Sequence, residues 1–324
     1  MQHIIMATIS IRKGGIMKKF ILRRLGYAIF SLFIITSLSF YIISLKPGDP
    51  IAAKVNQLPD ASKAVLEERY GLNDPLYMRY FSYMKGLLTE GNLGDSIIYD
   101  GRNVNMLLGT AAIVSAKIGG LAILIQVVIG VILGMFCGVA HGKIGDRIIT
   151  VLVVLAICVP SFVFCALLQY YVAYKWKLAP IMGWGGLKYY ILPVAAYAIP
   201  GIATYSKYMR NSTIQVLSED YIETARAKGC SKNRLIFKHV FRNAILPIVT
   251  MVPVAIGSIF GGAMVIEKFF SIPGFGQHYV KACSDTDSYM ILGMTVFFAF
   301  TYIVSLFVVD ILYGFVDPRI RISE

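Results

Sequence analysis

The spacing of charged residues is the feature that most limits what this chain can fold into. Only 15% of its 324 residues are charged, against about 25% in soluble domains, and the charges leave long gaps. A charge inside hydrocarbon costs several kcal/mol, so gaps of about 18 residues or more mark helices that can cross a bilayer. Six such windows exist: Leu25–Leu45, Ile118–Gly142, Ile148–Tyr174, Tyr189–Ser206, Asn243–Ile266 and Ser288–Val309.

The six windows predict an all-α membrane protein with six transmembrane helices. None has the two-residue alternation of a barrel strand, and the chain lacks the polar helix faces that a large soluble core would need. Residues 1–16 match neither a span nor a structured element, so Met17 is expected to be the native start. The predicted divisions are an N-terminal extension (1–16), a first transmembrane helix (17–46), an extracytoplasmic segment (47–110), a five-helix core (111–317) containing a cytoplasmic loop (207–243), and a cytoplasmic tail (318–324).

The placement of Lys and Arg predicts which side of the membrane each loop occupies. Six spans put both termini on one side, and basic residues concentrate on the cytoplasmic side. With the termini inside, 18 of the 31 Lys and Arg residues lie in cytoplasmic segments, and the short outer loops hold five. Both termini are therefore expected in the cytoplasm. Almost all of the net charge of +13 then lies in segments beside the anionic inner leaflet of the lipid bilayer. The positive charge is thereby explained without a nucleic-acid partner.

The segments between the windows carry helix signals of their own. In the extracytoplasmic segment, Asp60–Tyr70 and Pro75–Leu88 have helix-like polar patterns between turn signals, which predicts a small helical cap. In the cytoplasmic loop, Ser218 is expected to cap a helix from Glu219 to Lys228. Gly229 suits the left-handed residue that ends such a helix.

Two partners fit this short cytoplasmic helix. A basic amphipathic helix beside a span can lie on anionic lipid, but this helix lacks a broad apolar face. Tyr221, Ile222 and Ala225 instead form a small knob between charged flanks. A second helix, for which Ser231 is the expected cap, follows it. The knob favours a groove in a protein partner over the bilayer.

Glycines recur at intervals of four in two of the windows. Gly130, Gly134 and Gly138 lie in the second window, and Gly257 and Gly261 lie in the fifth. This spacing puts the glycines on one helix face, where another helix can approach closely. It predicts helix packing at these positions and says nothing about a ligand.

The chain shows no sign of chemistry of its own. It has no Gly-x-x-x-x-Gly-Lys-Ser/Thr phosphate loop, no nucleophile motif, and no metal-ligand spacing among its four histidines. We expect no enzyme activity, no metal site and no cofactor bound by this chain. Lys117, Glu267 and Asp310 lie at span edges, where snorkelling is the usual explanation, and the windows lack the mid-membrane charges of an ion-coupled carrier. Any uphill transport would therefore take its energy from a partner.

Several short motifs form a combination that covers nearly the whole chain from Met17. The cytoplasmic loop reads Tyr221-Ile222-Glu223-Thr224-Ala225-Arg226-Ala227-Lys228-Gly229, followed by Leu246-Pro247. Other landmarks are Pro47-Gly48-Asp49-Pro50, Gly94-Asp95-Ser96, Val159-Pro160-Ser161-Phe162 and Pro273-Gly274-Phe275-Gly276. Together they resemble the ATP-binding cassette (ABC) importer permeases of the peptide and nickel branch. Within that branch, Gly183-Trp184-Gly185-Gly186 is most similar to the first permease subunit of oligopeptide importers.

The resemblance implies a type I ABC importer permease fold in the bacterial cytoplasmic membrane. It also implies a complex with a second, homologous permease subunit, two cytoplasmic ATPase subunits that bind ATP and Mg, and an extracytoplasmic binding protein that delivers the peptide. The residues implied to couple this subunit to an ATPase are Tyr221, Glu223, Thr224, Ala225, Ala227, Lys228, Gly229, Leu246 and Pro247.

Cargo is expected to pass between the two permease subunits. Candidates to line that path are Gln169, Tyr170, Tyr197 and Tyr205, although aromatic residues suit helix interfaces and the membrane boundary equally well. Three alternatives stay open: a dipeptide or nickel permease of the same family, an ion-coupled secondary carrier, and a membrane-anchored scaffold.

Overall fold

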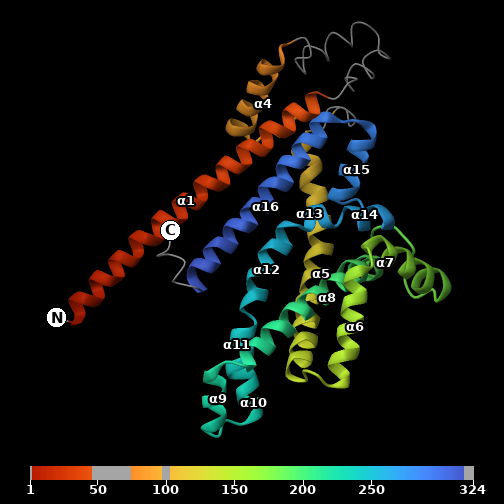
Figure 1. Ribbon diagram of the computed structural model, residues 1–324. Coiled ribbons are helices and arrows are strands. Elements are labelled where there is room, and N and C mark those ends of the chain that lie inside the picture. The colour runs from red at the N-terminus through yellow and green to blue at the C-terminus, as the bar shows by residue number, and fades with distance from the viewer. Residues whose placement is uncertain (1, 46–73, 97–102, 317–324) are drawn as a thin grey trace. The chain divides into compact units, whose positions relative to one another are not determined.

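The computed structural model describes residues 2–45, 74–96 and 103–316, and within these ranges the regular structure is helical (Figure 1). The one bridge between extended residues in this part of the chain joins Asp95 and Asn103. The all-α prediction is therefore confirmed. The elements are α1 (Gln2–Ser44), α4 (Leu76–Glu90), α5 (Val104–Val139), α6 (Ile144–Cys158), α7 (Ser161–Leu168), π-helix η1 (Gln169–Lys175), 3-10 helix η2 (Leu187–Tyr190), α8 (Ile191–Leu217), α9 (Asp220–Ala227), α10 (Lys232–Arg234), π-helix η3 (Leu235–Val240), α11 (Phe241–Ala244), α12 (Leu246–Gly257), α13 (Ile259–Gly262), α14 (Met264–Phe270), α15 (Phe275–Asp285) and α16 (Ser288–Val316).

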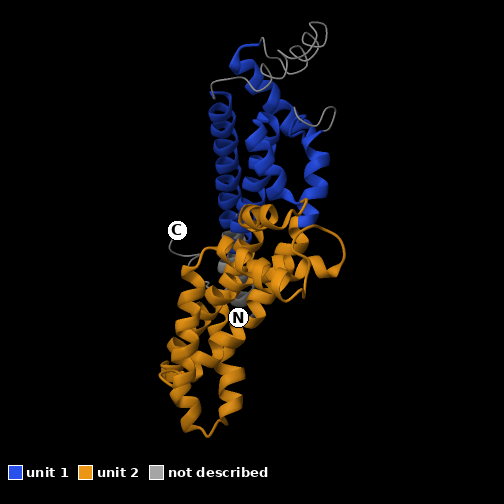
Figure 2. Cartoon of the chain, turned by 90° about the vertical axis from the view of Figure 1, so that its right-hand side faces the viewer, with its two compact units in different colours: residues 1–114, 274–324 blue, residues 115–273 orange. Residues whose placement is uncertain are grey.

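The chain divides into two compact units (Figure 2). Unit 1 consists of Met1–Val114 and Gly274–Glu324, and unit 2 is the continuous stretch Ser115–Pro273. The boundary falls inside α5, so this helix contributes its first part to unit 1 and the rest to unit 2.

Unit 1 is built on α1 and α16, which pack along each other, with α4 beside them. The predicted helix over Pro75–Leu88 is confirmed as α4, whereas the one over Asp60–Tyr70 lies outside the described residues. α4 buries Tyr80 and Tyr83 against Phe40 of α1, because its apolar side chains recur at helical spacing.

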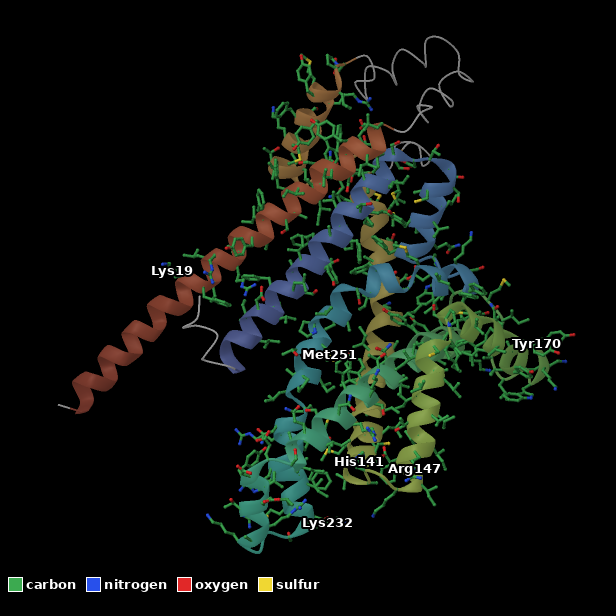
Figure 3. The ribbon with its side chains drawn as sticks, viewed as in Figure 1. Lys19, His141, Arg147, Tyr170, Lys232 and Met251 are labelled. Atoms are coloured by element: carbon green, nitrogen blue, oxygen red, sulfur yellow. The ribbon has the colours of Figure 1, made fainter. Side chains whose placement is uncertain are left out.

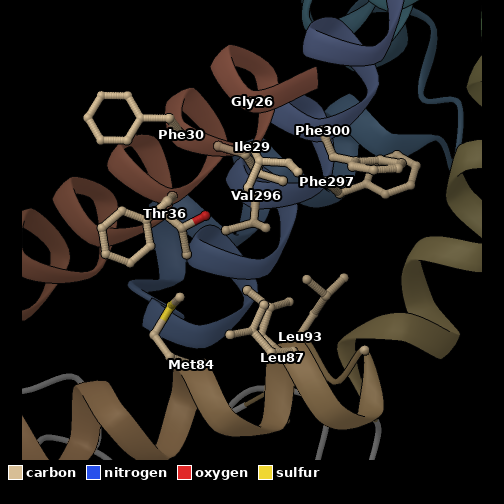
Figure 4. Close-up of a pocket in the computed structure, with 14 residues that line it drawn as sticks. Gly26, Ile29, Phe30, Thr36, Met84, Leu87, Leu93, Val296, Phe297 and Phe300 are labelled. Atoms are coloured by element: carbon tan, nitrogen blue, oxygen red, sulfur yellow. The ribbon is translucent and has the colours of Figure 1, made fainter. Parts of the chain in front are cut away.

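An apolar pocket of about 750 Å³ lies between α1, α4 and α16 (Figure 4). Its walls include Phe30 and Phe33 from α1, Leu87 from α4 and Phe300 from α16, and Thr36 adds a hydroxyl. The surface of the pocket is therefore almost entirely apolar.

Three helical stretches are long and apolar enough to cross a membrane: Lys19–Ser44, Val104–Val139 and Ser288–Leu312. Two bent pairs meet the same criterion together: Ile144–Cys158 with Ser161–Lys175, and Lys232–Ala244 with Leu246–Gly257. The described residues thus contain three candidate spans, or up to five if each bent pair crosses once. The fourth window, Tyr189–Ser206, forms parts of η2 and α8 and is not among them. The chain is a multi-pass membrane protein, and the count of six remains a prediction.

The third and fifth windows are not straight helices. α6 and α7 meet at 101°, and the break coincides with Pro160, which precedes the first residue of α7 and has no N–H to continue α6. The fifth window is divided among α11, α12, α13 and α14, with a 45° bend before α12. Pro247 stands in the first turn of α12 and Pro253 inside it. Both breaks coincide with prolines, so the sequence indicates where these helices break, although the charge-free windows do not give the angles.

Residues 2–16 differ from the expectation. They matched no structured element in the sequence, yet α1 runs unbroken from Gln2 to Ser44. Helix propagation adds one backbone hydrogen bond for each residue once a nucleus exists. The apolar segment Lys19–Ser44 supplies that nucleus, so the preceding residues continue its helix.

Candidate functional site

α5 and α8 approach each other closely along three glycines of unit 2. A Cβ atom at Gly130 would lie 2.6 Å from Cβ of Tyr205, and one at Gly138 would lie 2.6 Å from Cγ2 of Thr213. A Cβ atom at Gly134 would collide with the backbone of α8. Only glycine permits this separation, so the interval of four brings α5 against the helix that leads to the cytoplasmic loop.

A buried ion pair joins the first turn of α6 to α8. Arg210 donates from Nε to Asp146 Oδ1 at 2.6 Å and from Nη2 to Asp146 Oδ2 at 2.9 Å. Asp146, whose side chain is 2% exposed, also accepts hydrogen bonds from the Gly142 N–H and the Thr150 hydroxyl. His141, at the end of α5 (Figure 3), has its Nδ1 3.1 Å from Arg210 Nη2. The two parallel hydrogen bonds from Arg210 to the Asp146 carboxylate hold α6 and α8 in one relative orientation.

Asp146→Asn is expected to lower the free energy of unfolding by about 2 kcal/mol, because the Arg210 guanidinium loses its ionised acceptor. The measurement is thermal unfolding in detergent. The readout is the alkylation of Cys137, which is buried in the folded protein and becomes accessible on unfolding. The double variant Asp146→Asn/Arg210→Gln is the control, since it removes both charges and should regain part of the loss. Equal stability of Asp146→Asn and the unaltered chain would contradict the inferred role of the pair.

α9 begins one residue later than expected and without the predicted cap. Glu219 occupies the N-cap position with no side-chain hydrogen bond, and Ser218 instead donates its hydroxyl to the Gln215 carbonyl at 2.7 Å. Ser231 does stand at the N-cap of α10, again without a side-chain cap. The prediction that Ser218 caps α9 was therefore wrong, because its hydroxyl bonds back into the last turn of α8, whereas the predicted N-cap position of Ser231 is confirmed.

Ile222 fixes α9 to the body of unit 2. Its side chain is fully buried, and Ala225 packs against the same apolar cluster. The expected knob therefore points into this subunit and not toward a partner, since only Tyr221 of its three residues is exposed. The other buried members of the cluster are Val131, Tyr205, Met209, Leu235, Val240, Ala244 and Ile248.

Gly229 ends α9 in the left-handed region, with φ of +77°. Its N–H donates to the Arg226 carbonyl at 2.9 Å, and the N–H of Cys230 reaches back to the Ala225 carbonyl at 3.1 Å. A side chain at this φ is strained even though no atom lies within 4 Å of an added Cβ. The expected stop is confirmed, and it reverses the chain immediately after α9.

The return path runs through α10, η3 and α11 to α12. Asn243 donates to the Tyr221 hydroxyl at 2.9 Å, which ties α11 to the start of α9. Lys232, at the start of α10, is labelled in Figure 3. Leu246 and Pro247 begin α12 with exposed side chains. The two parts of the motif, Tyr221–Gly229 and Leu246-Pro247, thus stand at the beginning and the end of one compact helical hairpin.

The outward face of α9 carries Glu223, Thr224, Ala227 and Lys228, all exposed. Its inward face is fixed by Ile222. A short helix that is anchored on one side and exposed on the other can transmit a displacement to α5 and α8, which contact the same cluster.

The candidate pathway residues have different surroundings. Tyr205 is buried in the cluster that holds α9, and the Tyr197 hydroxyl lies 2.8 Å from where a Cβ of Gly262 would stand. Gln169 donates to the carbonyls of Ile181 and Phe269, whereas Tyr170 is exposed. Tyr205 therefore lines no open path in this conformation.

One residue at the edge of the fifth window differs from its interpretation in the sequence. Glu267, interpreted as snorkelling, is fully buried in α14, and the Ser115 hydroxyl donates to it at 2.5 Å. Burial of a carboxylate beside an apolar window has no local sequence signal, because its partner comes from α5. Close packing at Gly257 and Gly261 stays a prediction.

Comparison with known proteins gives a consistent result. The chain matches the family described as "Binding-protein-dependent transport system inner membrane component" over residues 130–322. It also matches "Binding-prot-dependent transport system membrane comp, N-term" over residues 17–97.

Individual relatives match over almost their whole length. The dipeptide transport system permease protein DppB of Bacillus subtilis (strain 168) is 36% identical, with 95% of this chain and 99% of that protein covered. The oligopeptide transport system permease proteins OppB of Haemophilus influenzae and of Salmonella typhimurium are each 38% identical, with 94% of this chain and 100% of those proteins covered. The chain therefore belongs to the family of binding-protein-dependent transport system inner membrane components.

Proposed function

We propose that this chain is the transmembrane permease subunit of an ATP-driven ABC importer that takes up oligopeptides. The observation that carries the proposal is α9, a short helix anchored by Ile222 and exposed at Glu223 and Lys228, in a chain whose relatives are named for oligopeptide and dipeptide transport. The loop Gly183-Trp184-Gly185-Gly186 supports oligopeptides as the cargo.

The partners follow from the same proposal. A second permease subunit would complete the pathway, two cytoplasmic ATPase subunits would bind ATP and Mg, and an extracytoplasmic binding protein would deliver the peptide. The membrane would be the bacterial cytoplasmic membrane, with six spans and both termini inside, because basic residues concentrate in the inner loops. Family membership supports this arrangement.

In the proposed mechanism, the exposed face of α9 lies in a groove of one ATPase subunit. Closure of the ATPases on ATP displaces α9, and its buried face passes the displacement to α5 and α8 through the cluster around Ile222. Tyr221, Thr224, Ala225, Ala227, Gly229, Leu246 and Pro247 complete the coupling loop. Gln169, Tyr170, Tyr197 and Tyr205 stay predictions for the path.

A dipeptide importer is the second candidate, favoured by the 36% identity to the Bacillus subtilis dipeptide permease. Uptake of labelled peptides by a deletion strain complemented with this chain distinguishes the two. Oligopeptide transport predicts that unlabelled pentapeptides compete with labelled tripeptide, whereas dipeptide transport predicts competition by dipeptides.

The energy source tests the class of transporter. We expect peptide uptake to stop when cellular ATP is depleted and to continue when an ionophore collapses the ion gradients while ATP is maintained. An ion-coupled secondary carrier predicts the reverse. Uptake that survives ATP depletion but fails with the ionophore would contradict the ABC assignment.

A further inference from the structure

The segment that follows α7 exposes a dense group of aromatic side chains. Tyr170, Tyr171 and Tyr174 come from η1, and Trp176 follows it. Their exposed fractions reach 65% at Tyr174 and 57% at Trp176, although aromatic side chains normally provide core packing. We name these four residues the aromatic platform.

The platform is held in a fixed position. Gln169, the first residue of η1, donates hydrogen bonds to the Ile181 and Phe269 carbonyls at 3.1 and 3.0 Å. The Gly183 N–H donates to the Phe270 carbonyl at 2.8 Å, which secures the loop beyond it. The rings also contact one another, with centroids of Tyr170 and Tyr171 5.0 Å apart. The exposure is therefore built into an ordered surface.

The 101° bend between α6 and α7 directs this segment away from the α6 axis, and Figure 3 shows Tyr170 beyond the end of α7. A π-helix follows α7 directly, and short π segments are often found at functional sites. The apolar α6 and α7 together are long enough to be a candidate span, whereas the lysines beyond them require water. We therefore expect the platform to lie at the boundary of a bilayer.

The charged residues of this segment have a single sign. Lys175 lies 5.8 Å from the ring centre of Tyr171, and Lys177 follows Trp176. No acidic residue occurs in the sequence between Asp146 and Glu219. A segment with exposed Tyr and Trp and two lysines complements lipid phosphates at the membrane interface.

We propose that the aromatic platform, with Lys175 and Lys177, binds anionic phospholipid headgroups at the bilayer boundary. The aromatic rings enter the region between headgroups and acyl chains, and the two ammonium groups contact lipid phosphate. The proposal goes beyond peptide transport and offers contact with lipid as the alternative to the cargo-path role predicted for Tyr170. A water-facing surface for a protein or peptide is the alternative that the experiment tests.

The chain offers a direct probe, because it has two tryptophans, Trp176 and Trp184. In Trp184→Phe, the fluorescence of the full chain in vesicles reports on Trp176 alone. We expect strong quenching by phospholipids brominated near the carbonyl end of the acyl chain, weaker quenching by bromination near the methyl end, and little quenching by acrylamide in the water. Trp176→Phe, which retains Trp184 packed 4.8 Å from Tyr190, supplies the comparison.

The lysines are tested by the choice of headgroup. Brominated phosphatidylglycerol is expected to quench Trp176 at least about twofold more than brominated phosphatidylcholine at equal mole fraction. Lys175→Gln/Lys177→Gln should abolish that preference, whereas Lys143→Gln, at the other end of α6, should retain it. Equal quenching by the two lipids, or strong acrylamide quenching without bromolipid quenching, would overturn the proposal. Neither result depends on peptide uptake, so failure here leaves the transport assignment to its own test.

Discussion

Peptide uptake is expected to fall to background in a Gly229→Pro variant that still inserts into the membrane. Gly229 has φ of +77° and donates its N–H to the Arg226 carbonyl. Proline fixes φ near −65° and has no N–H to donate, and at a position with an incompatible φ and a bonded N–H it destabilises by more than about 1 kcal/mol. The reversal after α9 would be lost, and α9 would no longer return toward η3. Uptake of labelled peptide, normalised to the amount of variant in the membrane, is the measurement.

Gly229→Ala is the matched control for that prediction. Alanine can adopt the left-handed conformation at a cost of about 1–2 kcal/mol, and its Cβ would meet no atom within 4 Å. Uptake should therefore be reduced but measurable. Normal uptake by Gly229→Pro at normal abundance would mean that the chain reversal is not needed for coupling.

Gly134→Val is expected to prevent recovery of folded protein. A Cβ at this position would overlap the Ser206 carbonyl of α8 and lie 2.7 Å from Cβ of Met209 and 3.0 Å from the Arg210 nitrogen. Two of these obstacles are backbone atoms, which cannot rotate away, so the helices must separate. We expect a loss of at least about 3 kcal/mol, the upper end for overpacking. The measurement is the yield of monodisperse protein in detergent, together with its unfolding temperature.

Gly120→Val provides the comparison within the same helix. Gly120 is also in α5, but a Cβ there would meet no atom within 4 Å. The helix propensity of the new residue is identical in both variants, so the difference between them isolates the contact with α8. If Gly134→Val and Gly120→Val were equally stable, the inferred close packing of α5 and α8 would be incorrect.

Local signals in the sequence predicted the parts of the site that depend on local physics. Gly229 requires a positive φ whatever surrounds it, and the interval of four from Gly130 to Gly138 places three missing side chains on one face. The helix over Pro75–Leu88 was likewise predicted from its own pattern and turn residues.

The features that were missed depend on partners distant in the sequence. Asp146 and Arg210 are 64 residues apart, and each alone resembles an ordinary loop charge. Ile222 could equally have faced a partner, because the direction of α9 is set by contacts with α5 and η3. Pro160 itself indicates a break, because proline cannot continue a helix, but a charge-free window measures hydrophobic length only and gives no size for the 101° change of direction.

The interruptions that follow α11 have a mechanical consequence. α5, α6 and α8 are fastened by the glycine contacts and the Asp146–Arg210 pair, so they behave as a stiff body. From Ile245 to Ala263, by contrast, the chain is divided into short helices. Deformation under load concentrates where stiffness is lowest. Backbone amides of α12 and α13 should therefore exchange with deuterium faster than those of α8 when the proposed ATPase partners turn over, which would locate the elastic element of unit 2.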